Sequence, residues 1–184
     1  MSFDTDSPDR LWLRDGTRLR VRPIRPDDRD RLVALFDRLS PESRHRRFLA
    51  PKPRLTSREL TYLTEVDHVS HEALVAVDDD GTIAGVSRYA AWHDRDGVAE
   101  IAIAVADDLH SRGLGSALAD RIVREACVNG IARLTAATLW GNRPAFAVLK
   151  RLGFRITEHG PVVELALDLR GAAASSPDAP AAAA

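Results

Sequence analysis

Three strand-like runs in the middle of the chain constrain its fold more than any other feature. The runs cover 73–77, 82–91 and 98–105, and they are separated by Asp-Asp-Asp-Gly and Asp-Arg-Asp-Gly. Aspartate and glycine favour tight turns, because aspartate bonds its own backbone and glycine adopts positive φ without a steric penalty. Tight turns join neighbouring antiparallel strands, so we expect the three runs to form an antiparallel meander.

The segments around the meander predict further strands and several helices. A strand is expected at 18–22, where apolar and charged residues alternate. Helix-start signals are Asp27, Ser40 before Pro41, the capping box Thr56-Ser57-Arg58-Glu59, and Asn142. The expected helices are 28–39, one from Pro41, 56–63, 113–128 and 142–152, and the later strands are 134–139, 154–157 and 162–167. The order β-α-α-α-β-β-β-α-β-α-β-β predicts an α/β domain with a mixed sheet and helices on both faces.

Composition favours one soluble globular domain. The 184 residues are 45% hydrophobic and 29% charged, and 26 basic residues nearly balance 27 acidic ones. We expect a folded unit at 11–170 between disordered tails at 1–10 and 171–184, the second an Ala/Ser/Pro run. With no signal peptide, no membrane-length apolar run and no excess positive charge, we expect a cytoplasmic protein that binds neither nucleic acid nor membrane. The single cysteine, Cys127, is expected to be buried in a helix.

The loop His110-Ser111-Arg112-Gly113-Leu114-Gly115 carries the chemistry. It joins a strand to a helix, and the first amides of a helix are unpaired donors that favour an anion. Gly113 and Gly115 let the backbone approach a phosphate closely, and Ser111, Arg112 and Ser116 can add side-chain donors. The spacing matches neither a Walker loop nor a dinucleotide fingerprint. Taken alone, the two glycines also fit a plain tight turn.

With Val105 before it, and Asn142 and Leu152-Gly153-Phe154 after it, this loop resembles the acetyl-CoA-binding core of the GNAT superfamily of N-acetyltransferases. The resemblance implies a mostly antiparallel sheet of about seven strands, flanked by helices and splayed at its central strands. It also implies acetyl-CoA as co-substrate. The expected contacts are the pantetheine arm at Ile103, Ala104 and Val105, the pyrophosphate along His110, Ser111, Arg112, Gly113, Leu114, Gly115 and Ser116, and a further contact from Asn142. His110 stands where the family has Gln or Arg.

A narrower resemblance covers most of the folded unit. The segments Leu13-Arg14-Asp15-Gly16-Thr17, Arg22-Pro23-Ile24-Arg25-Pro26-Asp27-Asp28 and Leu39-Ser40-Pro41-Glu42-Ser43 look like the catalytic domain of Pat-type bacterial protein lysine acetyltransferases. Arg47-Phe48 and the segment from Asp67 through His71 to Ala76 also contribute to it. This resemblance implies that the acceptor is a protein lysine, for example on acyl-CoA synthetases. Pat-type enzymes often carry a second, sensor-like or synthetase-like domain, and we expect none within this chain.

Glu100 is the candidate general base. It is an acid in an otherwise apolar strand, and alternation places it on one face with Ala102 and Ala104. Burial there raises the pKa of a glutamate, which suits a base. The Pat-type resemblance implies a catalytic glutamate at this point, whereas a purely structural interpretation pairs Glu100 with an arginine such as Arg88. GNAT enzymes often have a tyrosine as general acid where this chain has Leu149, so we assign no general acid.

Two further clusters were weighed for other roles. His68 and His71 have a metal-like spacing but lack further ligands, so no metal is expected. The run Arg44-His45-Arg46-Arg47 is interpreted as a solvated face, with a docking patch as the alternative. Three functions stay open: a protein lysine acetyltransferase, a small-molecule amine N-acetyltransferase, and a catalytically silent acyl-CoA-binding module. We expect a monomer or a homodimer.

Overall fold

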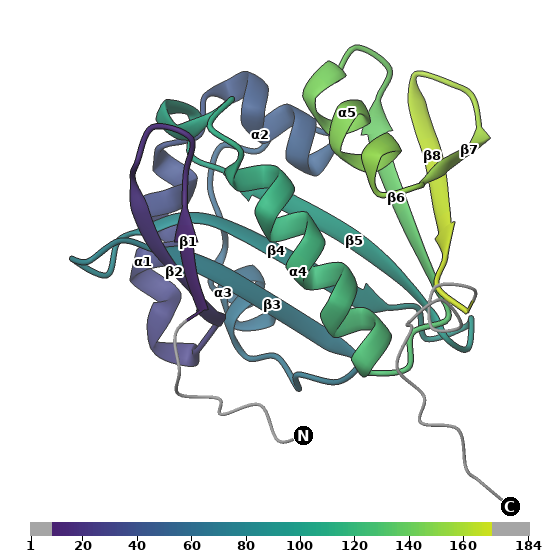
Figure 1. Ribbon diagram of the computed structural model, residues 1–184, viewed down its shortest axis with the longest axis horizontal. Helices are drawn as coiled ribbons and strands as arrows, with labels where there is room; N and C mark the ends of the chain where they lie inside the picture. The colour runs from purple at the N-terminus through teal and green to yellow at the C-terminus, as the bar shows by residue number, and fades with distance from the viewer. Residues whose placement is uncertain (1–8, 171–184) are drawn as a thin grey trace, which may run out of the picture.

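An eight-stranded mixed sheet runs through the protein (Figure 1). The computed structural model describes residues 9–170. The strands follow the order β1-β2-β3-β4-β5-β6-β8-β7, and every neighbouring pair is antiparallel except β5 and β6. The strands are β1 (Asp9–Trp12), β2 (Arg18–Pro23), β3 (His71–Val77), β4 (Ile83–Ala91), β5 (Val98–Val105), β6 (Arg133–Leu139), β7 (Arg155–Glu158) and β8 (Val162–Asp168). The predicted meander of β3, β4 and β5 is confirmed.

Helices cover both faces of this sheet (Figure 1). They are α1 (Arg29–Asp37), α2 (Pro41–Phe48), α3 (Ser57–Thr64), α4 (Leu114–Val128) and α5 (Arg143–Arg151), with short 3₁₀ turns at Pro26–Asp28 and Asp107–Leu109. One buried cluster joins the α4 row Leu114, Leu118 and Ile122 to the sheet. A second cluster joins α1 and α3 to the opposite face, through Leu32, Leu35 and Leu60. The mixed architecture expected from the sequence is therefore confirmed.

The helix starts follow the chemistry of their caps. The Ser40 hydroxyl accepts from the Ser43 amide at 3.1 Å, and Thr56 and Glu59 form the predicted capping box. At α1 the prediction is corrected, since Asp28 and not Asp27 is the residue bound to the backbone ahead of the helix. The fully buried Asp28 carboxylate accepts from the Arg25 amide at 2.9 Å and from both terminal nitrogens of Arg22 at 2.6 and 2.7 Å.

The N-terminal boundary and the cysteine also differ from expectation. Strand β1 begins at Asp9, inside the segment predicted as a tail, because Asp9–Trp12 pairs antiparallel with β2. The remainder of that segment, 1–8, and the predicted tail 171–184 lie outside the described residues. Cys127 is exposed rather than buried, because the buried row of α4 passes through Ile122 and Ala126 instead.

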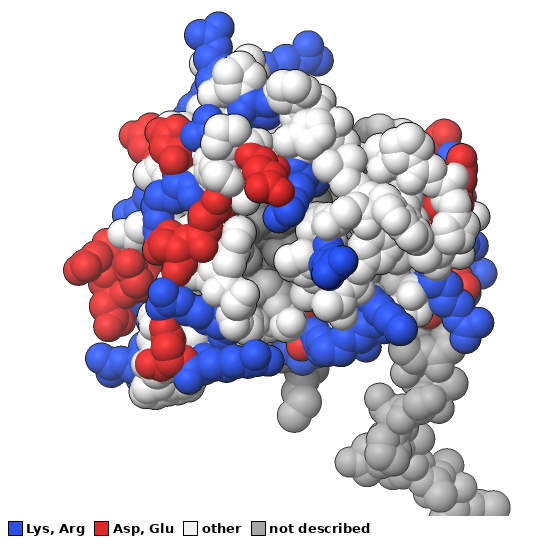
Figure 2. Space-filling view, turned by 90° about the horizontal axis from the view of Figure 1, so that it is seen from above, with Lys and Arg blue, Asp and Glu red and all other residues white. Residues whose placement is uncertain are grey.

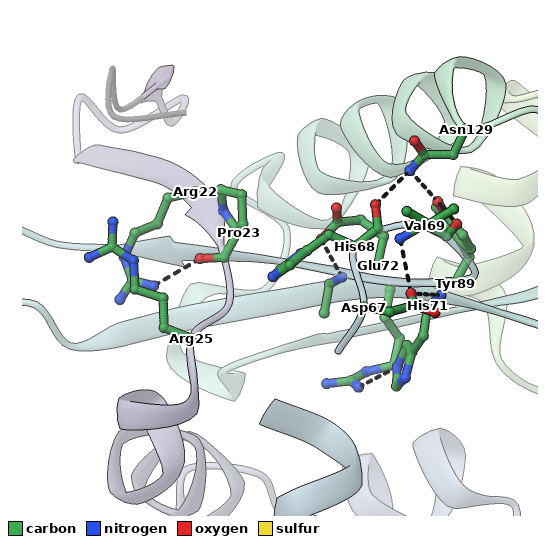
Figure 3. A network of polar contacts seen from close by, with 12 residues as sticks. Arg22, Pro23, Arg25, Asp67, His68, Val69, His71, Glu72, Tyr89 and Asn129 are labelled. Carbon is green, nitrogen blue, oxygen red and sulfur yellow. Dashed lines mark hydrogen bonds and ion pairs between the residues drawn. The ribbon is translucent and has the colours of Figure 1, made fainter. Parts of the chain in front are cut away.

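A polar network fixes the start of β3 against the end of α4 (Figure 3). The Asp67 carboxylate accepts from the amides of Val69 and His71 at 2.9 and 2.7 Å. The Tyr89 hydroxyl donates to the Val69 carbonyl at 2.9 Å and accepts from the Asn129 amide at 2.6 Å. With this loop held in place, β3 enters the sheet in the register that aligns His71 with Ala90.

Candidate functional site

The sheet opens between its two parallel strands. β5 and β6 pair at only three positions, and the last pair is Glu100 with Thr135. β5 stays paired with β4 as far as Val105, whereas β6 turns away from it (Figure 1). Residues 101–105 therefore border a V-shaped gap, with Glu100 at its narrow end.

The backbone of β5 presents polar groups to this gap. The Ala106 amide donates to the Ala84 carbonyl of β4 at 3.0 Å. In an antiparallel ladder every second residue directs its backbone N–H and C=O to the partner strand, so the backbone groups of Ala104 also point toward β4. The same alternation turns the backbone groups of Ile103 and Val105 away from β4 and into the gap. Their amides are suitable donors for an extended ligand that takes the place of a neighbouring strand.

The start of α4 lies directly after β5. Gly113 has φ +95°, a left-handed conformation that favours glycine, and α4 begins at Leu114. The first amides of the helix have no intrahelical acceptor and lie at the positive end of its dipole. A Cβ added at Gly115 would contact only the Val105 side chain, at 3.8 Å, so the space outside this turn is open. Seen from the end of the molecule toward which the gap widens, the surface is hollowed among mainly uncharged residues (Figure 2).

The side chains of His110 and Arg112, of which Arg112 was expected to donate to a ligand, have protein partners. His110 Nε2 donates to the Val105 carbonyl at 3.0 Å, which ties the loop to the end of β5. Arg112 forms an ion pair with Asp15 of the β1–β2 turn. The pKa of Asp15 is lowered to about 2, mainly by the backbone hydrogen bond from Thr17 and also by Arg112. The backbone of this loop, rather than these side chains, is thus available to an anion.

Arg14 lies beside the candidate anion site, and the sequence reasoning did not single it out. Its side chain lies beside Gly113, where a Cβ would be 3.8 Å from the Arg14 Nε. The Arg14 amide also donates to the Arg112 carbonyl at 3.2 Å, so the β1–β2 turn is bound to the loop. The signal was present, because Arg14 lies in the first of the segments that resemble Pat-type enzymes.

Asn142 caps α5, as predicted. Its side-chain oxygen accepts from the Ala145 amide at 3.4 Å, and its nitrogen donates to Thr138 Oγ1 at 3.1 Å. Both side-chain polar atoms therefore have partners within the protein, and a contact with a cofactor at Asn142 stays a prediction.

Glu100 is half-buried on the face of β5 that looks toward α2. Burial raises the pKa of its carboxyl, and the charge of Arg47 partly offsets this rise. Within residues 9–170 the carboxylate forms no ion pair closer than 4 Å, so the alternative pairing with Arg88 does not occur. Arg88 instead donates to the Leu63 carbonyl at 3.2 Å and to His71 Nε2 at 3.1 Å.

The basic run on α2 is not a uniform solvated face. Arg44 lies over the Phe36 ring at 4.1 Å, and Arg46 pairs with Glu42 of the same helix. Arg47 points inward, where its charge acts on Glu100 and Arg88. Interpreting the run as one solvated face missed the inward direction of Arg47, because the direction of each side chain depends on how α2 packs against the sheet.

Two other expectations concern proton donors and metal ligands. Leu149, which stands where many GNAT enzymes have tyrosine, is 7% exposed and lies in the α4-side core. His68 binds Glu72, whereas His71 contacts Arg88. His71 and Glu72 are successive residues of β3 and point to opposite faces of the sheet, so the two imidazoles do not converge. Among the residues the structure describes, no group of three His, Cys, Asp or Glu side chains is placed to hold a metal ion. Nor does any helix in that part of the chain have the length and apolar character needed to span a membrane.

Comparison with known proteins gives a consistent result. Residues 18–155 match the family model described as an acetyltransferase (GNAT) domain. The chain is 34% identical over 145 residues to acetyltransferase PA5475 of Pseudomonas aeruginosa, covering 77% of each chain. It is 30% identical over 153 residues to acetyltransferase Pat of Mycolicibacterium smegmatis. The aligned region covers 83% of this chain and only 45% of that relative. The crystal structure of the GNAT domain of S. lividans PAT superposes with a TM-score of 0.81 at 34% identity, covering 87% of this chain and 96% of that one.

Proposed function

Because the chain belongs to the GNAT family of acetyltransferases, whose members use acetyl-CoA as co-substrate, we propose that it acetylates the side-chain amine of a protein lysine. The similarity to Pat of M. smegmatis and to the S. lividans PAT domain supports a protein acceptor, for example an acyl-CoA synthetase. Because the chain matches less than half of the Pat relative, the acceptor proposal rests on the acetyltransferase part alone.

The residues at the splay fit the co-substrate. The gap-facing amides of Ile103 and Val105 are donors for the pantetheine arm and the thioester at its end, in the position of the missing strand partner. The first-turn amides after Gly113 are donors for the pyrophosphate, and Arg14 adds a positive charge beside them. Bound there, the co-substrate supplies a thioester, that is, an activated acetyl carbonyl.

Glu100 accepts the proton of the incoming amine. A lysine amine has a reference pKa near 10.4, so deprotonation at pH 7 costs about 4–5 kcal/mol. The raised pKa of Glu100 makes its carboxylate a stronger base than an exposed one, and Arg47 favours the ionised form. One N–H proton of the ammonium passes to a Glu100 carboxylate oxygen, directly or through water.

The neutral nitrogen then forms a bond to the acetyl carbon as the carbon–sulfur bond breaks. The Ile103 amide is the donor best placed to stabilise the carbonyl oxygen, because it faces the gap and is nearer to Glu100 than the Val105 amide is. As the carbon–sulfur bond breaks, the nitrogen loses its second proton to water, which can pass it to the thiolate, so that the amide and CoA are the products and no acyl-enzyme is required. No general acid is assigned.

The observation that carries this proposal is the end of the β5–β6 ladder at Glu100, which places an unpaired carboxylate where the gap begins. Acetyl-CoA turnover on purified acyl-CoA synthetases should therefore fall about 100-fold or more in Glu100→Gln, the usual contribution of a general base. The matched control is Glu158→Gln on the exposed edge strand β7, which should keep full activity.

Acetyl-CoA affinity is measured in parallel by calorimetry. Glu100→Gln should bind acetyl-CoA as the wild type does, because Glu100 is not among the proposed cofactor donors. Equal turnover in the two proteins would remove Glu100 from the mechanism. Tight acetyl-CoA binding with no turnover on protein or small-molecule amines would instead support a silent acyl-CoA-binding module.

A further inference from the structure

A small cavity beneath β4 and β5 has two arginines as its polar lining. The cavity measures about 30 Å³ and lies between the sheet and helices α1 to α3. Arg47 of α2 and Arg88 of β4 line it, and all its other lining residues are apolar, among them Phe36, Phe48 and Ala104. Since one water needs about 10–15 Å³, the space suits a group with two oxygen atoms.

Neither arginine has a close anionic partner in the described part of the chain. Arg88 is 5% exposed, and its two hydrogen bonds go to the Leu63 carbonyl and to His71. His71 is a neutral acceptor at pH 7, because burial and the charge of Arg88 lower its pKa to about 4. The carboxylate that acts on Arg47 through its charge is Glu100, and the two form no ion pair.

Holding the buried Arg88 and the half-buried Arg47 at one apolar cavity is unfavourable unless an anion lies between them. A desolvated guanidinium without a carboxylate or phosphate loses hydration that neutral hydrogen bonds only partly replace. The pKa of Arg88 is lowered to about 9 by burial first and by Arg47 second, which shows that the site disfavours its positive charge. A carboxylate in the cavity would remove that penalty and could accept from both guanidinium groups.

Resting on the acetyl transfer proposed above, we propose that this cavity binds a carboxylate of the acyl acceptor itself. Glu100 pairs with Ala90 on β4, so Arg88 is its diagonal neighbour on the same face, at a general spacing of about 7–8 Å. An acceptor that places its amine at Glu100 and its carboxylate between Arg47 and Arg88 must hold the two groups a few bonds apart. The source is an acidic residue beside the target lysine, or the α-carboxylate of a free amino acid.

Paired peptides test the proposal. They carry one lysine with Glu or Gln immediately before or after it, and KM is compared within each pair. For the wild type we expect a KM at least about tenfold lower for a Glu peptide, as a charge-assisted hydrogen bond provides. In Arg88→Met this ratio should fall to about one, whereas Arg46→Met, the same change at the neighbouring surface arginine, should keep it. Free amino acids form the second arm, and an Arg88-dependent KM confined to them would identify the α-carboxylate as the source.

A measurement without turnover separates this inference from the proposed function. Sodium acetate, compared with sodium chloride at equal ionic strength, should raise the Tm of the wild type and leave that of Arg88→Met unchanged. Should Arg88→Met not fold, Arg88→Lys keeps the charge but not the two-pronged geometry, and should reduce the Glu preference without abolishing it. Glu100-dependent turnover with no Glu preference and no acetate effect would overturn the carboxylate site alone. No turnover on any amine, with the acetate effect intact, would overturn the acetyl transfer and leave the anion site standing.

Discussion

At the level of single residues, the charge on Arg47 sets the pH range in which Glu100 can accept a proton. Burial raises the pKa of Glu100 and Arg47 lowers it. Removing the positive charge in Arg47→Gln should therefore raise this pKa further. Since only the carboxylate acts as a base, activity is lost as pH falls through the pKa, and the acidic limb of the kcat/KM profile should move to higher pH. A pH series with a peptide that has no acidic residue next to its lysine measures this limb without involving the carboxylate cavity.

Arg46→Gln is the matched control for that experiment. It removes the same charge one residue earlier on α2, where the side chain pairs with Glu42. Its acidic limb should coincide with that of the wild type. A limb that stays in place in Arg47→Gln would show that Arg47 does not act on the base, or that Glu100 is not the group titrating.

Single-residue predictions succeeded where the information was local. The partners of Ser40, Thr56 and Asn142 lie three residues away, so the sequence contains both members of each cap. The Arg112 partner, Asp15, lies 97 residues away, and the inward direction of Arg47 depends on tertiary packing. Such contacts have no signature in sequence spacing.

At the level of elements, the start of α4 depends on the backbone conformation of Gly113. Its φ of +95° is strained for any residue with a Cβ. Gly113→Ala should therefore cost about 1–2 kcal/mol of stability and weaken acetyl-CoA binding, because relief of the strain turns the first amides away from the pyrophosphate. Chemical denaturation and calorimetric titration with acetyl-CoA measure the two effects.

Substitutions at two other glycines, one at each end of α4, distinguish the effect of backbone strain on stability from the effect on acetyl-CoA binding. Gly130, at the far end of α4, has φ +75° and open space around it, so Gly130→Ala should lose similar stability and keep its acetyl-CoA affinity. Gly115 lacks a positive φ and has room for a methyl group, so Gly115→Ala should fold normally. If Gly113→Ala and Gly130→Ala bound acetyl-CoA equally well, the loop backbone would not be the anion site.

The long elements were predictable because each has its own periodicity and its own stop signals. The meander, the α4 row and the later strands lie within a few residues of the predicted positions. β1 was missed because its four residues carry too little pattern, and only pairing with β2 defines it. The gap between β5 and β6 was expected from the family resemblance alone. Whether residues 101–105 have a neighbouring strand depends on how the whole sheet assembles, and the sequence of β5 does not contain that information.

At the scale of the whole molecule, the sheet consists of two parts joined by a short ladder. β1 to β5 and β6 to β8 meet through three residue pairs, and the shared α4-side core completes the junction. A ligand that pairs with 103–105 and also reaches the start of α4 would occupy the opening between these parts. Because it binds only the folded state, acetyl-CoA at about 100 times its Kd should raise the free energy of unfolding by about 2.7 kcal/mol.

Hydrogen exchange shows where that stabilisation arises. The Ile103 and Val105 amides face the gap and should exchange more slowly when CoA is bound, as should the first-turn amides of α4. The CoA fragment 3′-phosphoadenosine 5′-diphosphate ends at the pyrophosphate and lacks the pantetheine arm. It should slow exchange of the α4 amides and leave the exchange rates of Ile103 and Val105 unchanged. Because the two groups of amides lie on different elements, the comparison separates the two halves of the ligand within one molecule. Stabilisation by CoA without slower exchange at Ile103 and Val105 would place the pantetheine arm outside the gap, and Glu100 would then no longer lie beside the thioester.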